Sequence, residues 1–234
     1  MDGQRKLPLF LVGLTGSMGC GKSHVGERFA ALGAWLIDTD RVARRVVAPG
    51  SEGLRAVIER FGPSFLEVTG SETLPGLDRK KMADWIFTHP EDRVVLESML
   101  HEWILREVRD TLLQEFERET GGPVAKTRVA ILEVPLLFET GWDRLCDRTV
   151  NVACGCHQWS RLACRDNMSD AVKRQVMLRQ LPEEEKNRRA HHVIDNSGSM
   201  EATSAQVHRL WLHFQEQARP HRRFLWPDPH PPTG

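Results

Sequence analysis

Residues 16–23 read GSMGCGKS and match the pattern G-x-x-x-x-G-K-[S/T] at every defined position. A short apolar run, Phe10–Leu14, leads into this loop, and the following segment places Val25, Phe29 and Leu32 on one helical face. A strand, a glycine-rich loop and a helix in this order form a P-loop, the phosphate-binding motif of nucleotide-dependent enzymes. The alternative is a glycine-rich turn without chemistry, which the flanking strand and helix disfavour.

The spacing within this loop follows from phosphate binding. Glycines let the backbone wrap closely around a phosphate with its N–H groups pointing inward, and the positive end of the next helix adds to the attraction. Lys22 is expected to reach the β- and γ-phosphates of ATP, and the Ser23 hydroxyl is expected to bind Mg²⁺. Further nucleotide contacts are expected at Gly16, Gly19, Cys20, Gly21 and His24, the last mainly through backbone N–H groups.

Further apolar runs follow the P-loop and predict an α/β fold with a parallel sheet flanked by helices. The first run, Ala34–Ile37, comes after the P-loop helix and completes a strand-helix-strand unit, which implies parallel strands. Other candidate strands are Val129–Val134, Thr149–Ala153 and His192–Ile194.

The rest of the chain predicts how a single P-loop unit over residues 1–218 is organised. Its core is expected at about 7–61, 124–156 and 191–218, interrupted by a mainly helical insertion at about 62–120. A second, charge-rich helical stretch follows residue 157 and is divided at 167–170 and at Pro182. Residues 219–234 hold five prolines without periodicity and are expected to be disordered or extended.

Composition excludes several other classes of protein. The 32 basic and 32 acidic residues cancel, so the broad positive surface of a nucleic-acid binder is not expected. The apolar run near the amino terminus is far shorter than the roughly 20 residues of a membrane-spanning helix, and no signal peptide is recognisable, which favours a cytoplasmic protein. Five cysteines without a C-x-x-C pair favour reduced thiols over disulfides or a zinc site.

Two acidic residues, Asp38 and Asp40, follow the second strand at the edge where ligands bind to parallel sheets. Alternation along an extended backbone would place both carboxylates on one face, where one could accept a proton from an attacking hydroxyl. The alternative is that Asp40 caps a helix that begins at Arg41.

Two arginines and a glutamate are further candidates for the nucleotide site. Arg161 and Arg165 are four residues apart and share a helical face, so they could close over a triphosphate; a solvated face with Asp166 as ion partner is the alternative. Glu133 ends the third predicted strand. It could hold the water shell of Mg²⁺, or it could be a buried acid with a structural partner.

Several motifs in sequence order resemble the dephospho-coenzyme A kinase family. They are Gly13–Ser23, Leu36–Asp40, Ala43-Arg44, Pro49-Gly50, Leu77–Lys81, Phe87, Leu100-His101, Val134–Glu139, Arg165-Asp166 and Val193–Asn196. The P-loop is shared by many families, but the Asp-x-Asp, Leu-Asp-Arg and Pro-Leu-Leu-Phe-Glu elements together are specific. The resemblance covers roughly residues 10–198.

The resemblance implies transfer of the ATP γ-phosphate to the ribose 3′-hydroxyl of dephospho-CoA, a step that uses ATP and Mg²⁺ and gives CoA. It implies that Asp40 is the base and that Arg161 is a lid residue near the transferring phosphate. Together with Lys22, these two residues would be the catalytic ones. Arg165 and Asn196 would lie toward ATP. Residues 62–120 would bind the CoA moiety, and residues 157–185 would form the lid. The expected acceptor contacts are Asp38, Arg79, His101, Pro135, Leu136 and Phe138.

Departures from the family pattern and two alternative functions remain open. His24 replaces the usual hydroxyl residue, Glu102 replaces the usual proline, and the loop at 70–76 is longer than usual. The motifs also fit a nucleoside or nucleotide kinase, or a nucleotide-dependent regulatory module without catalysis. A GTPase is not expected, because the sequence has no N-K-x-D element.

Overall fold

The computed structural model describes residues 9–67, 74–119, 128–163 and 170–218. The chain divides into two compact units. One combines Met1–Asp38 with Thr120–Pro227, and the other combines Thr39–Glu119 with Asp228–Gly234. Each unit contains buried apolar side chains of its own.

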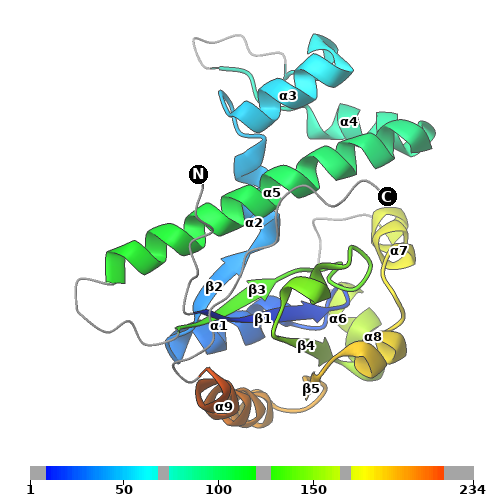
Figure 1. Cartoon of the computed structure of the whole chain (residues 1–234). Coiled ribbons are helices and arrows are strands. Elements are labelled where there is room, and N and C mark those ends of the chain that lie inside the picture. Colours follow the sequence, from blue (N-terminus) through cyan, green and yellow to red (C-terminus); the bar gives the residue numbers. More distant parts are fainter. Residues whose placement is uncertain (1–8, 68–73, 120–127, 164–169, 219–234) are drawn as a thin grey trace. The chain divides into compact units, whose positions relative to one another are not determined.

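A parallel sheet forms the centre of the first unit (Figure 1). Its strands are β1 (Leu9–Gly16), β2 (Trp35–Asp38), β3 (Arg128–Glu133), β4 (Arg148–Ala153) and β5 (His192–Asp195). They lie in the order β2-β3-β1-β4-β5, and each neighbouring pair is parallel. All five predicted strands are therefore confirmed, and so is the α/β fold. Short runs of mostly buried residues, as in β1 and β3, are typical of parallel strands covered on both faces.

One face of this sheet packs against α1 (Lys22–Ala31) and α9 (Met200–Gln217). Val25 and Phe29 of α1 are fully buried there, as the helical spacing predicted. Phe214 of α9 lies near Phe10 and Phe29, with ring centroids 6.0 and 6.1 Å apart. The aromatic contacts fix α1 under β1, and α1 in turn begins where the P-loop ends.

The opposite face of β1 lies close to the segment that follows β3. A Cβ on Gly13 would be 2.8 Å from Cys146 Sγ and 2.9 Å from a methyl carbon of Leu137. Between these two residues lies η2 (Trp142–Leu145), and the buried Trp142 packs here. Close packing on this face leaves no room for a side chain at position 13, so β1 is held from both sides.

Several short helices follow β4 in the region where the sequence predicted a divided helical stretch. They are η3 (Gly155–His157), α6 (Gln158–Ala163), α7 (Asp170–Leu178) and α8 (Glu183–Arg189). Pro182 is the residue before α8, so the predicted break at this proline is confirmed. The predicted break at 167–170 falls largely outside the described residues, although α7 begins at Asp170.

Helices make up most of the second unit. Its elements are α2 (Thr39–Val46), α3 (Glu52–Phe61), η1 (Pro63–Phe65), α4 (Arg79–Thr88) and α5 (Pro90–Glu119). The Ser51 hydroxyl accepts a hydrogen bond from Leu54 N at 3.1 Å and caps α3, while Asp78 caps α4 by accepting from Lys81 N at 2.9 Å. Pro90 begins α5, the position in a helix where proline loses no hydrogen bond.

The second unit begins at Thr39, whereas the sequence placed the start of the helical insertion near residue 62. It therefore takes in α2 and α3, which the sequence assigned to the core. The predicted tail at 219–234 and residues 70–73 of the predicted loop at 70–76 lie outside the described residues. Among the helices that are described, including the 30-residue α5, none is both long and apolar enough to cross a membrane.

Candidate active site

The phosphate loop connects the end of β1 to the start of α1. Gly16 is the last residue of β1, and Lys22 is the first residue of α1. Gly21 has a φ of 83°, a left-handed conformation that favours glycine, and a Cβ at this position would lie 2.3 Å from Asn196 Nδ2. Gly21 is thus required both by backbone conformation and by the side chain that packs on the loop.

A buried carboxylate joins the two polar side chains of the motif. Glu133 Oε1 accepts hydrogen bonds from Lys22 Nζ at 2.5 Å and from Ser23 Oγ at 2.6 Å. The Glu133 residue is 2% exposed. A charge so deeply buried requires a partner, and Lys22 provides it. The structure therefore brings together the lysine, the hydroxyl and the acid that the sequence assigned to phosphate and Mg²⁺.

Strand pairing explains why Glu133 reaches the loop. Glu133 is the last residue of β3 and lies level with Leu14 on β1 and Asp38 on β2. The carboxyl ends of parallel strands meet at one edge of a sheet, which is the edge where ligands bind. Gly26 leaves the space for the Glu133 side chain, because a Cβ on Gly26 would lie 3.0 Å from Glu133 Oε2.

The chain changes from strand to helix directly after Asp38. Asp38 ends β2 in the first unit, whereas Asp40 is an exposed residue in the first turn of α2 in the second unit. The backbone is not extended between them, so the argument that alternation places both carboxylates on one face is wrong. The capping alternative is also wrong, because α2 begins at Thr39 and Asp40 lies inside it.

Asn196 contacts the phosphate loop, and Arg161 contacts Asn196. Asn196 Nδ2 donates to Cys20 O at 2.8 Å, and Arg161 donates from a guanidinium nitrogen to Asn196 O at 2.7 Å. Thr203 Oγ1 donates to Asn196 Oδ1 at 2.8 Å and fixes the amide. These contacts place Arg161 beside the nucleotide loop, whereas Arg165 lies outside the described residues.

Two glutamine side chains hold the backbone of the loop at Met18. Gln180 Oε1 accepts from Met18 N at 2.9 Å, and Gln158 Nε2 donates to Met18 O at 3.0 Å. Gln158 begins α6, and Gln180 lies between α7 and α8. Neither glutamine was predicted from the sequence, since side-chain contacts across 140 and 162 residues leave no local pattern.

Three of the acceptor residues predicted in the first unit lie in the loop after β3, while the fourth, Asp38, ends β2. Pro135 and Leu136 are partly exposed, while Phe138 is buried and 7% exposed. Lys186 of α8 holds this loop in place. It donates a hydrogen bond to Pro135 O at 3.1 Å and forms a salt bridge with Glu139 at 3.2 Å. The Lys186 side chain is 0% exposed, and burial lowers its pKa although Glu139 raises it.

Arg79 and His101, the other predicted acceptor residues, belong to the second unit. Arg79 is exposed at the start of α4 and donates to Arg44 O at 3.5 Å. His101 lies on α5 and is partly buried, and this burial lowers its pKa. A neutral His101 ring would offer both a donor and an acceptor to a polar ligand.

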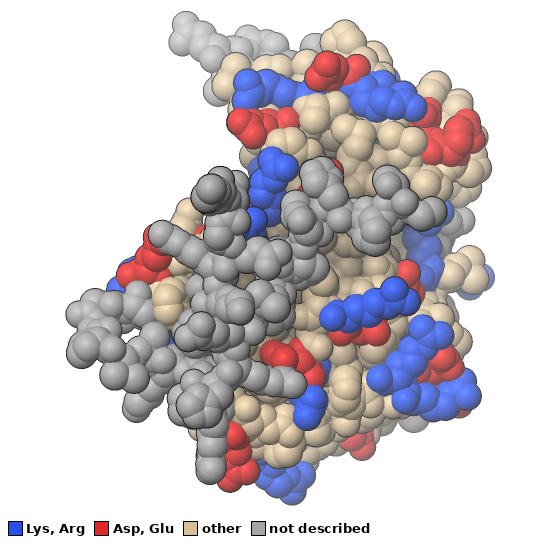
Figure 2. Space-filling view, viewed as in Figure 1, with Lys and Arg blue, Asp and Glu red and all other residues tan. Residues whose placement is uncertain are grey.

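Charges of both signs are mixed on the described surface. Figure 2 shows blue and red side chains next to one another on the face in view. Exposed ion pairs such as Arg93–Glu97 and Arg189–Glu185 are examples of this mixing. Near the phosphate loop, the positive charges of the described residues include Lys22, which begins α1, and Arg161, which contacts Asn196.

Comparison with known proteins identifies the family of the chain. The sequence matches the family model described as dephospho-CoA kinase over residues 10–202. A dephospho-CoA kinase domain-containing protein of Danio rerio is 41% identical over 204 residues, which are 86% of this chain and 84% of the relative. The dephospho-CoA kinase of Shewanella oneidensis is 39% identical over 202 residues, which are 86% of this chain and 91% of the relative.

Solved structures give the same result for the fold. TT1252 from Thermus thermophilus has a TM-score of 0.65 and 31% sequence identity, and the match covers 88% of this chain and 97% of that one. Dephospho-CoA kinase from Campylobacter jejuni has a TM-score of 0.60 and 22% identity, with 88% and 98% covered. The family match over most of the chain and these relatives lead to one conclusion: the protein belongs to the dephospho-CoA kinase family.

Proposed function

We propose that this protein transfers the γ-phosphoryl group of ATP to the ribose 3′-hydroxyl of dephospho-CoA, giving CoA and ADP. Membership of the dephospho-CoA kinase family across residues 10–202 supports this reaction, and ATP is the phosphoryl donor that a kinase of this family uses. The observation that carries the proposal at the level of atoms is the group formed by Lys22, Ser23 and Glu133 at the phosphate loop.

In this proposal Lys22 binds the β- and γ-phosphates and neutralises charge on the transferring group. Its ammonium group is held by Glu133 in the structure, at the point where the loop meets α1. When phosphate oxygens arrive, Lys22 exchanges part of its contact with Glu133 for contact with them. Glu133 therefore keeps the lysine in place before the nucleotide binds.

Mg²⁺ is the proposed metal, and its site is argued from the donors present. Ser23 Oγ and Glu133 Oε1 are oxygen ligands 2.6 Å apart beside the loop, and Mg²⁺ prefers oxygen ligands and phosphates. Ser23 would bind the ion, and Glu133 would hold its water shell. When bound, Mg²⁺ withdraws charge from the phosphate oxygens.

Asp40 is the proposed base. The ribose hydroxyl attacks the γ-phosphorus, the bond from that phosphorus to the β,γ-bridging oxygen breaks, and the hydroxyl proton passes to the Asp40 carboxylate. Arg161 stabilises the charge that develops on the transferring group. Asp38, Arg79, His101 and the loop of Pro135, Leu136 and Phe138 are proposed to bind dephospho-CoA.

The domain roles are proposed on the same basis. Residues 62–120 would hold the CoA moiety, and residues 157–185 would form a lid over the nucleotide, with Arg165 and Asn196 toward ATP. The contacts of Gln158 and Gln180 with Met18 support the lid role, because they already join this region to the loop. A cytoplasmic location is proposed with the activity.

The reaction is tested by supplying purified protein with Mg·ATP and measuring the products by mass spectrometry. Dephospho-CoA should be converted to CoA with equal formation of ADP. Faster phosphorylation of a nucleoside would favour the nucleoside kinase reading instead, and tight nucleotide binding without ADP formation would indicate a regulatory module.

A further inference from the structure

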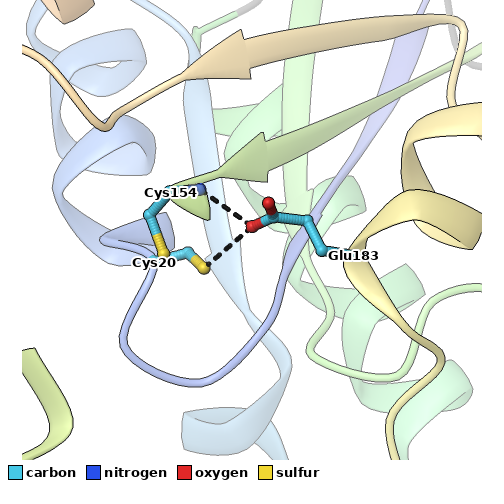
Figure 3. A group of neighbouring side chains, drawn as sticks. All are labelled: Cys20, Cys154 and Glu183. Carbon is cyan, nitrogen blue, oxygen red and sulfur yellow. Dashed lines mark hydrogen bonds between the residues drawn. The ribbon is translucent and has the colours of Figure 1, made fainter. Parts of the chain in front are cut away.

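Two thiols and a carboxylate from three separate elements meet behind the phosphate loop. Cys20 belongs to the loop, Cys154 follows β4, and Glu183 begins α8 (Figure 3). One ligand atom from each of the three, the two Sγ atoms and a carboxylate oxygen, all lie within 4.8 Å of one another. All three residues belong to the first unit. Figure 3 shows the Cys20 sulfur joined to a Glu183 carboxylate oxygen, with the second sulfur beside it.

The Glu183 carboxylate is held in place by backbone groups. Its Oε2 accepts from Cys154 N at 2.8 Å and from Cys20 Sγ at 3.5 Å, and its Oε1 accepts from Gly155 N at 3.0 Å. The two backbone N–H groups orient the carboxylate toward the sulfur atoms. A fixed carboxylate beside two thiols is an oriented set of three ligand atoms.

Burial decides what these thiols can do. Both cysteines are 0% exposed, and burial raises the pKa of each thiol, with the Glu183 charge acting in the same direction. Disulfide formation starts from a thiolate, which these surroundings disfavour. A metal ion differs, because its own charge removes the proton from a coordinating thiol.

The donor set selects the class of ion. Two sulfurs and one carboxylate oxygen suit Zn²⁺, which binds sulfur at about 2.3 Å and carboxylate oxygen at about 2.0–2.2 Å. Tetrahedral ligands at these lengths lie about 3.3–3.8 Å apart, so the spacing of up to 4.8 Å has to shorten by at most about 1.5 Å. Hard ions such as Mg²⁺ prefer oxygen ligands and do not fit this set.

We propose that Cys20, Cys154 and Glu183 form a binding site for a thiophilic divalent cation such as Zn²⁺, with water as a fourth ligand. Binding replaces two S–H bonds by two S–metal bonds and releases two protons to solvent. The bound ion links the phosphate loop, the end of β4 and the start of α8. This site is distinct from the proposed Mg²⁺ site and does not depend on the proposed kinase reaction.

Cobalt(II) provides a direct spectroscopic test with the full chain, reduced and kept free of oxygen. Binding should give a thiolate-to-cobalt charge-transfer band that saturates at one ion per chain and is removed by excess Zn²⁺. Cys20→Ser and Cys154→Ser should each lose most of the band, and Glu183→Gln should weaken binding by about tenfold or more. Cys146→Ser is the matched control, since Cys146 donates to Trp142 O outside the cluster and should keep the full signal.

Two measurements on the unaltered chain keep the test valid if a variant does not fold. X-ray absorption of the Zn²⁺ form should show two sulfur neighbours at about 2.3 Å with the rest of the shell nitrogen or oxygen. Because two protons are released, apparent affinity should rise about a hundredfold for each pH unit between pH 6 and 8. A zinc shell without sulfur, or a cobalt band that persists in both Cys20→Ser and Cys154→Ser, would overturn the proposal.

Discussion

Glu133 is the residue on which the two polar side chains of the P-loop converge. It is buried at the end of β3, and its Oε1 accepts from Lys22 and from Ser23. The sequence left two roles open for this acid, a place near Mg²⁺ or a structural partner. The ion pair with Lys22 fulfils the structural role, and the contact with Ser23 places the same oxygen beside the proposed metal ligand.

Replacing Glu133 separates these two roles. Glu133→Gln keeps the shape of the side chain but removes the charge that orients Lys22 and the proposed Mg²⁺ water shell. We expect kcat/KM to fall by about 10–100-fold and the Mg²⁺ concentration for half-maximal rate to rise. Steady-state rates across a Mg²⁺ series measure both effects, with Glu27→Gln on the exposed side of α1 as control. If the rate of Glu133→Gln depended on Mg²⁺ as in the unaltered chain, Glu133 would not act on the Mg²⁺ site and would serve only as the ion partner of Lys22.

Asp40 is the second residue whose role is open to a direct test. Asp40→Asn cannot accept the ribose proton, so we expect kcat to fall by about 10²–10⁴-fold while ATP affinity is largely kept. Rapid-quench measurement of CoA formation gives the first quantity, and nucleotide titration gives the second. Glu52→Gln replaces another acid in the first turn of a helix of the same unit and should leave kcat near normal. A near-normal kcat in Asp40→Asn would exclude this residue as an essential base.

At the scale of elements, strands and helices were predictable because their signals are local. Apolar runs predicted the five strands, Pro182 marked a helix boundary, and helical spacing placed Val25 and Phe29 in the core. The change from β2 to α2 at Thr39 was not predicted. The sequence at Thr39 and Asp40 fits the end of a strand and the start of a helix equally well.

Contacts between elements were less predictable from the sequence. Gln158 and Gln180 meet Met18, and Cys20 meets Cys154 and Glu183, through separations of more than 130 residues. Such contacts follow from strand order and helix placement rather than from spacing along the chain. The group of Lys22, Ser23 and Glu133 could be predicted from the sequence. The P-loop motif predicted the first two residues, and the end of a strand predicted the third.

Lys186 joins α8 to the loop after β3, and removing it should destabilise the first unit. Lys186→Met retains most of the volume but leaves Glu139 charged and largely buried, with one carboxylate oxygen that already has no hydrogen-bond partner among the described residues. Breaking a buried ion pair in this way costs about 3–5 kcal/mol of unfolding free energy. Urea unfolding measures this loss.

A control on the same helix makes this prediction specific. Arg188 of α8 is 76% exposed in its side chain and pairs with Glu185. Because exposed pairs contribute about 0–1 kcal/mol, Arg188→Ala should change the unfolding free energy little. Equal losses in Lys186→Met and Arg188→Ala would mean that the buried pair does not hold the loop.

At the scale of the whole molecule, pH should affect stability through His192. Its Nε2 is buried and has no hydrogen-bond partner in the described part of the chain, and its ring lies 5.5 Å from that of Phe214. Burial first, and then His213, His191 and Arg148, lower the pKa of His192 in the folded state. The unfolded chain therefore binds this proton more readily, so stability is fully present above pH of about 6.5 and is lost as pH falls below it.

The variant His192→Phe keeps the ring and removes the titration. We expect the unfolding free energy to fall less between pH 7.5 and 5.5 in this variant than in the unaltered chain, as measured by urea unfolding at each pH. His208→Gln, on an exposed position of α9, should retain the original pH dependence. If both variants showed the same dependence as the unaltered chain, His192 would not be its source.

The balance of charge over the whole chain is consistent with a small, local phosphate site. Basic and acidic residues number 32 each, while Lys22 and Arg161 lie beside one loop. The proposed binding of a small polyanion at this loop needs no broad positive surface. Family membership then identifies the substrate pair that such a site would serve, ATP and dephospho-CoA.

The most direct test of this account is the rate of ADP formation across a panel of acceptors. The panel contains dephospho-CoA, adenosine, other nucleosides and nucleoside monophosphates, each with Mg·ATP, and mass spectrometry identifies each product. Dephospho-CoA should give the highest kcat/KM, with CoA carrying the new phosphate on its 3′-oxygen. A higher kcat/KM for any nucleoside or nucleotide, or no transfer to dephospho-CoA, would contradict the account.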